Sequence, residues 1–196
     1  MFGLGKKKKK AKKKAKEIKR FTSFLRTLQA RSPTTTAERI WGTILSRLMQ
    51  SYGEKAKEAI QTQTLPTWQE AQRRAEILQQ TGAPGEYGRL AEYFAERFGK
   101  WLTQKTEEAT EKARPEITTQ WRTIYETLTK PEFGMVYGLA TTGKERFGAS
   151  IVPEIRQTVQ EAVKSYQEAL KSLEDFLTSY GITDITPTEI IKSIWG

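Results

Sequence analysis

Apolar residues recur along this chain at spacings of three and four, the period of an α-helix with one buried face. The longest such run lies between Pro153 and Gly181. Its apolar members are Ile155, Val159, Ala162, Val163, Tyr166, Leu170, Leu173, Leu177 and Tyr180. Proline is favoured at the first position of a helix and glycine just past the end, so this run predicts one long helix.

The N-terminal half of the chain contains further helical patterns. Ile18, Phe21, Leu25 and Leu28 form an apolar stripe, and Ser32-Pro33 should end that helix. The capping box Thr35 to Glu38 predicts the start of a second helix, which we expect to close at Leu65-Pro66. Another capping box, Thr67 to Glu70, predicts a third helix that reaches Thr81-Gly82, before a turn at Ala83-Pro84-Gly85.

The second half of the chain shows the same period with two interruptions. Residues 87–128 predict a helix that is broken or kinked at Arg114-Pro115. The four glycines between Phe133 and Val152 lack clear periodicity and predict a long loop, with at most short helical turns. A capping box at Thr186 to Glu189 begins a short terminal helix. Its apolar residues, which we expect to dock on other parts of the protein, are Ile190, Ile191, Ile194 and Trp195.

No segment alternates apolar and polar residues with period two, so we expect an all-α fold. The prediction is a helical-bundle body of four or more helices, residues 33–196, preceded by a basic helical arm, residues 1–32. The five tryptophans are expected to be packing residues and not platforms for stacked bases: Trp41, Trp68, Trp101, Trp121 and Trp195.

The composition argues against catalysis. The chain has no Cys and no His, which removes thiolate nucleophiles and the commonest general base and metal ligand. Glu107, Glu108 and Glu111 lie among basic residues and are interpreted as a solvated helix face. We therefore expect a structural protein, not an enzyme, with no cofactor and no metal. The absence of Asn and the scarcity of Asp favour a protein adapted to high temperature.

Basic charge is concentrated at the N-terminus. Residues 1–31 contain ten Lys, three Arg and one Glu, a net charge of +12, so the rest of the chain has −2 of the total of +10. A basic arm on a nearly neutral body is typical of polyanion binding. The predicted phosphate-binding residues are Lys6, Lys7, Lys8, Lys9, Lys10, Lys12, Lys13, Lys14, Lys16, Lys19, Arg20, Arg26, Arg31, Arg39 and Arg47.

Two other interpretations of the lysine run stay open. A basic run can serve as a solubility tail or a localisation signal. It can also bind anionic lipid, with Phe2 and Leu4 inserted into the membrane surface. Neither a membrane-spanning helix nor a signal peptide is expected, because no apolar stretch of the required length is present. We therefore expect synthesis in the cytoplasm.

The chain resembles the major coat proteins of filamentous and rod-shaped double-stranded DNA viruses of archaea, the lipothrixvirus and rudivirus group. The resemblance rests on the basic helix from Lys6 to Arg31, the break at Pro33, the helical body, and the long helix ending Ser179-Tyr180-Gly181-Ile182-Thr183. It implies a virion protein made in the host cytoplasm, whose subunits form a helical filament. N-terminal helices would wrap the DNA in A-form.

The resemblance also implies partners. These are double-stranded DNA, further copies of the chain or a paralogous coat protein in a heterodimer, and a lipid envelope in the lipothrixvirus kind. The residues alone leave two alternatives: a chromatin-like DNA-binding protein with a basic tail, and a polybasic scaffold on a membrane surface.

Overall fold

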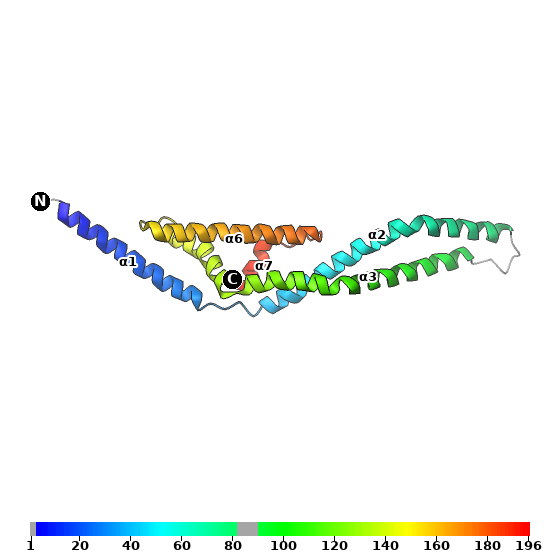
Figure 1. Cartoon of the computed structure of the whole chain (residues 1–196), viewed down its shortest axis with the longest axis horizontal. Coiled ribbons are helices and arrows are strands. Elements are labelled where there is room, and N and C mark those ends of the chain that lie inside the picture. Colours follow the sequence, from blue (N-terminus) through cyan, green and yellow to red (C-terminus); the bar gives the residue numbers. More distant parts are fainter. Residues whose placement is uncertain (1–2, 82–89) are drawn as a thin grey trace. The chain divides into compact units, whose positions relative to one another are not determined.

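The computed structural model describes residues 3–81 and 90–196, with side chains from residue 7 onward and, after the gap, from residue 92. Every regular element in these residues is a helix, which confirms the all-α prediction (Figure 1). The elements are α1 (Gly3–Gln29), α2 (Ala37–Thr81), α3 (Leu90–Thr129), α4 (Pro131–Gly138), the π-helical η1 (Leu139–Gly143), α5 (Lys144–Phe147), α6 (Pro153–Ser179) and α7 (Pro187–Trp195).

Contacts divide the chain into two compact units. Unit 1 comprises Met1–Ile44 and Trp121–Gly196, and unit 2 comprises Leu45–Gln120. Unit 1 therefore includes α1, the first turns of α2, the end of α3 and everything that follows. The separate division into an arm, residues 1–32, and an assembly domain, residues 33–196, is based on charge and stays a prediction.

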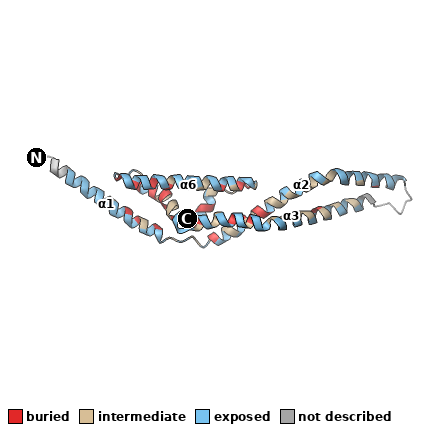
Figure 2. Ribbon diagram, in the orientation of Figure 1, coloured by how far each residue is buried: buried red, intermediate tan, exposed pale blue. Residues whose placement is uncertain are grey.

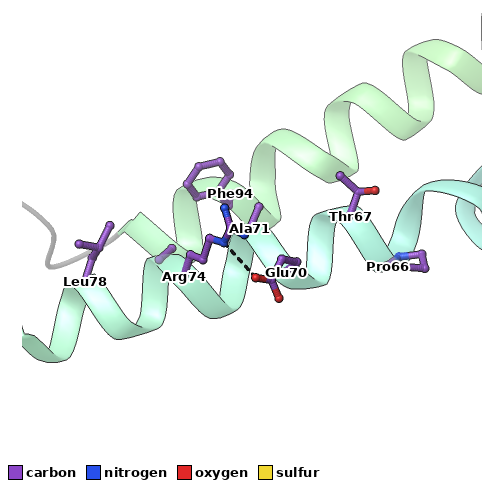
Figure 3. Close-up of a pocket in the computed structure, with 8 residues that line it drawn as sticks. Pro66, Thr67, Glu70, Ala71, Arg74, Leu78 and Phe94 are labelled. Atoms are coloured by element: carbon purple, nitrogen blue, oxygen red, sulfur yellow. Dashed lines mark hydrogen bonds and ion pairs between the residues drawn. The ribbon is translucent and has the colours of Figure 1, made fainter.

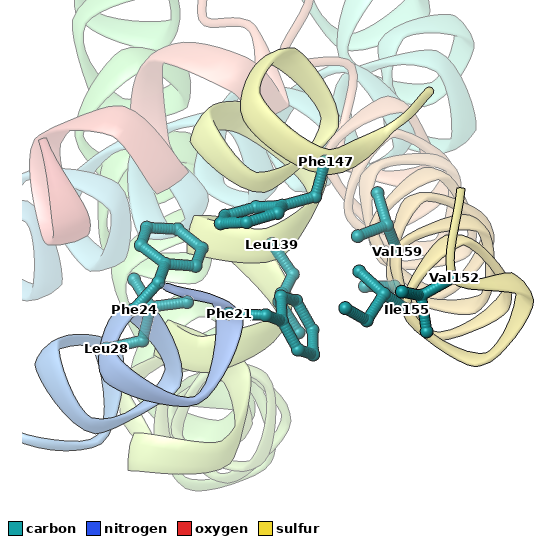
Figure 4. Close-up of a cluster of buried hydrophobic side chains, with 9 residues drawn as sticks. Phe21, Phe24, Leu28, Leu139, Phe147, Val152, Ile155 and Val159 are labelled. Carbon is teal, nitrogen blue, oxygen red and sulfur yellow. The ribbon is translucent and has the colours of Figure 1, made fainter. Parts of the chain in front are cut away.

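The core of unit 1 joins α1 to the C-terminal half of the chain (Figure 4). Figure 2 shows the buried residues of α1 confined to its second half. The ring of Phe147 lies 5.2 Å from that of Phe21 and 5.5 Å from that of Phe24. The buried cluster consists of Phe21, Phe24, Leu28, Leu139, Phe147, Val152, Ile155, Val159 and Ala162. The predicted stripe of α1 is therefore buried only in part, because Phe21 and Leu28 enter this core while Ile18 is 44% exposed. From the predicted stripe of α6, this core takes Ile155, Val159 and Ala162.

Two tryptophans anchor the rest of unit 1. Trp121 is fully buried, stacks on Phe176 at 6.3 Å between ring centroids, and donates its indole N–H to the carbonyl of Trp41 at 3.1 Å. Trp195 is also buried and donates its indole N–H to the carbonyl of Leu128 at 2.7 Å. A buried indole N–H needs such a partner, because leaving it unpaired costs roughly 1–3 kcal/mol.

The terminal helix α7 forms as the sequence predicted. The Thr186 hydroxyl accepts from the Glu189 backbone N–H, and the Glu189 carboxylate accepts from the Thr186 backbone N–H, completing the capping box. All four apolar residues of the helix are buried, so the expected docking is confirmed. The long helix after Pro153 is also confirmed, and Gly181 ends it with a positive φ of 78°.

Most of the glycine-rich segment is helical: the predicted long loop is limited to residues 148–152, and the prediction was wrong for residues 133–147. Helices α4, η1 and α5 occupy residues 131–147. A Cβ on Gly134 would lie 2.5 Å from two ring carbons of Trp195, and a Cβ on Gly138 would overlap the side chain of Leu28. These glycines are needed for close helix packing, which outweighs their low helix propensity.

Two prolines also lie inside helices. Pro66 is within α2, so the predicted break at Leu65-Pro66 and the capping box at Thr67 were wrong. Pro115 lies within α3, which continues to Thr129 without a break. The start of α2 was nearly correct, because the helix begins at Ala37, directly after Thr36. The predicted turn at Ala83-Pro84-Gly85 lies outside the described residues, as does Tyr87.

Unit 2 is built on α2 from Leu45 and α3 as far as Gln120, packed side by side (Figure 1). The Trp68 ring of α2 lies within 5.0 to 6.5 Å of three aromatic rings of α3. Those three partners are Phe94, Phe98 and Trp101. This aromatic contact explains why α2 continues beyond Pro66, since the packing of Trp68 on α3 compensates for the lost backbone hydrogen bond.

Candidate nucleic-acid interface

The first half of α1 is a helix whose charged side chains face solvent. Every lysine from Lys7 to Lys19 is exposed, and Lys6 lies in the helix although its side chain is outside the described residues. Successive residues of an α-helix are rotated by about 100°, so eight lysines in the nine positions Lys6 to Lys14 surround its axis. This segment therefore presents positive charge in every direction.

The lysines of α1 lack compensating charge. None of the lysines from Lys7 to Lys19 forms an ion pair with another described residue. The single acid of α1, Glu17, is half-buried, and one of its oxygens has no hydrogen-bond partner among the described residues. The charge of this helix is therefore available to an external anion.

The charge density of the segment is close to that of duplex DNA. At a rise of 1.5 Å per residue, Lys6 to Lys14 spans about 13.5 Å, which gives one positive charge per about 1.7 Å. Double-stranded DNA carries one negative charge per about 1.7 Å of its axis. The two linear charge densities match, so a duplex alongside the helix can be neutralised locally.

The second half of α1 anchors the helix to the rest of unit 1. Phe21, Phe24 and Leu28 enter the core, while Arg20 and Arg26 stay exposed on other faces (Figure 4). The predicted arrangement, with an apolar face on protein and basic faces in solvent, is present from Phe21 onward, whereas Ile18 is exposed.

Two basic residues that the sequence did not single out extend this surface. Lys144 and Arg146 are exposed on α5, the short helix that packs on α1 through Phe147. The Arg146 guanidinium lies over the Phe24 ring at 5.6 Å. Both residues fall in the segment that the sequence predicted as a loop, and only the packing of Phe147 on Phe24 reveals that α5 lies next to α1.

Arg31 has a structural role. It is half-buried and donates from its guanidinium to the Trp195 carbonyl at the C-terminus. The chain just after it is attached to the same helix end, because the Thr34 backbone N–H donates to the Ile194 carbonyl at 2.7 Å and the Thr36 hydroxyl donates to the Ser193 carbonyl at 2.6 Å. This junction secures the base of α1 to α7.

The last two predicted phosphate-binding residues lie on α2. Arg39 is exposed in its first turn and belongs to unit 1. Arg47 is half-buried and belongs to unit 2. The structure therefore groups Arg39 with the lysine helix in one unit and places Arg47 in the other.

Neither a metal site nor a membrane span is found in the part of the chain that the structure describes. No group of three or more acidic residues there is placed to hold an ion, and no helix there is long and apolar enough to cross a bilayer. The chain matches no protein-family model, no curated protein and no solved structure.

Proposed function

We propose that this protein is a structural DNA-packaging protein that binds double-stranded DNA through the lysine half of α1 and assembles through its helical body. The observation that carries this proposal is the uncompensated run of lysines, whose linear charge density matches that of a duplex. Binding would involve phosphates and not base edges, so it would be independent of DNA sequence.

The arrangement of the lysines favours enclosure by DNA over contact with a flat surface. Lysines on every side of a helix can all meet phosphate only if phosphate lies on several sides. A helix that lies on a membrane usually separates a basic face from an apolar face, whereas residues 6–14 have no apolar face. Duplex DNA wrapped around the helix satisfies all of these charges, whereas a helix seated in one groove has phosphates on its two flanks only.

The organisation of the chain supports a coat protein of a filamentous archaeal virus. A basic N-terminal helix, a proline break and an all-helical body are the features of the lipothrixvirus and rudivirus coat proteins that this chain resembles. The proposed partners are double-stranded DNA held in A-form and further copies of the chain or a paralogous coat protein. The proposed localisation is the virion, with a lipid envelope in the lipothrixvirus kind.

The test is to mix the purified full-length chain with linear duplex DNA at moderate salt and image the products by electron microscopy. A variant with the eight lysines of residues 6–14 changed to Gln removes the charge and keeps good helix formers, and a Lys→Arg variant keeps the charge. We expect uniform helical filaments from the wild type and the Arg variant only.

Other outcomes would contradict the coat proposal. Discrete DNA complexes without filaments would favour the chromatin-like alternative. Binding to anionic vesicles in the absence of any affinity for duplex DNA would favour the membrane scaffold.

A further inference from the structure

Unit 2 contains an apolar groove of about 760 Å³ on one side of its two helices. All but one of the lining residues belong to α2, and Phe94 of α3 completes the wall (Figure 3). Ala71 is half-buried and has a short side chain, which leaves room for another helix to approach closely, whereas Ala75 is buried within unit 2. Glu70 and Arg74 lie beside them and form an ion pair at 2.9 Å.

Within the described residues, unit 2 exposes several large apolar side chains near the far ends of its two helices. Ile77 and Tyr93 are 51% and 52% exposed, and Leu78, which lines the groove, is 43% exposed. The Trp68 and Phe94 rings are only half-buried although they contact each other. Large exposed apolar residues gathered near a groove mark an interaction surface.

The groove face of α2 can be set against the same face of an antiparallel copy. Thr67, Ala71, Arg74 and Leu78 follow one another at spacings of four, three and four, a pattern that reads the same in both directions. A two-fold axis midway along this run sets an antiparallel copy opposite it, with Leu78 against Thr67 of the other copy and Arg74 against Ala71. Arg74 then also lies beside the opposing Glu70, so two complementary charge pairs form.

The available area fits a weak dimer. About this axis, residues 64–81 of α2 overlap with the same residues of the second copy, a length of about 27 Å. Two helices of about 10 Å diameter in each copy set an upper bound of roughly 500 Å² buried per copy, or about 1,000 Å² in total. That is at the lower limit for a specific interface, where dissociation constants in the micromolar range are ordinary.

We propose that the groove of unit 2 binds the same groove of a second copy of this chain, which makes a four-helix contact across a two-fold axis. This proposal rests on the assembly part of the proposed function and specifies the surface that is used. It does not require DNA.

The chain has no cysteine, so a single introduced thiol reports its own neighbours. Ala71→Cys places two thiols near the proposed axis, and helices packed 8–10 Å apart would bring their Cα atoms to within about 7 Å, close enough for a disulfide. Gln69→Cys is the control, because Gln69 is exposed on the opposite face of the same helix. In full-length protein at tens of micromolar, oxidation should cross-link A71C at least tenfold faster than Q69C. Equal rates, or no cross-linked dimer, would overturn the proposal.

A charge exchange tests the pairing itself. E70R places Arg opposite Arg74, and R74E places Glu opposite Glu70, so each variant alone should dimerise about tenfold more weakly or worse. When the two variants are mixed, both pairs become complementary, and sedimentation velocity should detect a heterodimer of about wild-type affinity. Helix content by circular dichroism checks that each variant folds.

The two proposals can fail independently. A mixture that does not restore the dimer would refute the groove contact. DNA binding by the same variants should be unchanged, because residues 70 and 74 are not among the predicted phosphate-binding residues. Loss of DNA affinity in the lysine variant is likewise independent of dimerisation.

Discussion

At the scale of single residues, unit 1 depends on close contacts between a large side chain and a glycine of another helix. Trp195 is the clearest case. Its ring lies on Gly134 while its indole N–H is bonded to Leu128. Because the ring is rigid and buried, it cannot move aside cheaply when the space above the glycine is filled.

Gly134→Ala should therefore destabilise the protein by about 1–3 kcal/mol, as is usual for an overpacked core. Gly42→Ala is the matched control, since Gly42 is also helical and a Cβ there has no atom within 4 Å. That change should stabilise the protein by about 0.5–1 kcal/mol through helix propensity. Urea unfolding of both variants measures the difference, and equal stabilities would refute the close contact.

The capping box of α7 makes its stability sensitive to acid. The backbone N–H of Thr186 and then its hydroxyl lower the pKa of Glu189. A carboxyl whose pKa is lower in the folded state than in the unfolded state contributes stability above its unfolded pKa, about 4.3, and loses it as the pH falls through the folded value.

Amide hydrogen exchange in α7 should therefore accelerate as the pH falls below about 4, relative to α6 in the same molecule and after correction for intrinsic rates. Glu189→Gln keeps an acceptor oxygen without a titrating group, so in that variant the ratio of α7 to α6 exchange should not change over this range. A pH-dependent ratio that is the same in both proteins would show that Glu189 is not the cause.

At the scale of elements, α1 combines an exposed basic segment with a segment that packs in the core. Its lysine half is solvated, and its second half is anchored through Phe21, Phe24 and Leu28. Removing residues 1–31 to test DNA binding would therefore also remove part of the core of unit 1. Substitution of charge alone is the cleaner experiment.

Phe24→Ala should lower the free energy of unfolding by about 3–5 kcal/mol, because removal of the large aromatic side chain leaves a cavity beside Phe147. Ile18→Ala is the control on the same helix and should have a small effect, since Ile18 is 44% exposed. Thermal or urea unfolding compares the two. Similar losses would mean that α1 is not held by its aromatic face.

The sequence predicted helices best where the pattern is amphipathic and the ends carry clear signals. The helix from Pro153 to Gly181 and the capping box at Thr186 are examples. It failed at Pro66 and at Gly134 and Gly138, where local propensity opposes a helix and contacts distant in sequence favour one. Those contacts, with Phe94, Trp195 and Leu28, are not visible in a local pattern.

The same reasoning applies to the candidate site. The lysine run and its exposed faces could be predicted because a run of charge is a local property of the chain. The structural role of Arg31 and the basic pair on α5 could not, because both depend on where Trp195 and Phe24 lie after folding.

At the scale of the whole molecule, the basic charge and most of the helical body belong to different parts of the chain. Residues 1–31 hold a net charge of +12, while the rest holds −2 and includes the long helices of unit 2. Such a chain can neutralise DNA with one segment and form protein contacts with others. The near-neutral body limits repulsion between copies that bind side by side.

The most direct test of this account is the salt dependence of DNA binding by the full-length chain. If about ten phosphates are neutralised by the ten lysines of α1, the logarithm of the binding constant should fall against the logarithm of salt concentration with a slope near −9. With the eight lysines of residues 6–14 changed to Gln, the slope should be near −2. A nearly salt-independent affinity, or the same slope in both proteins, would contradict the claim that the lysine half of α1 binds the duplex.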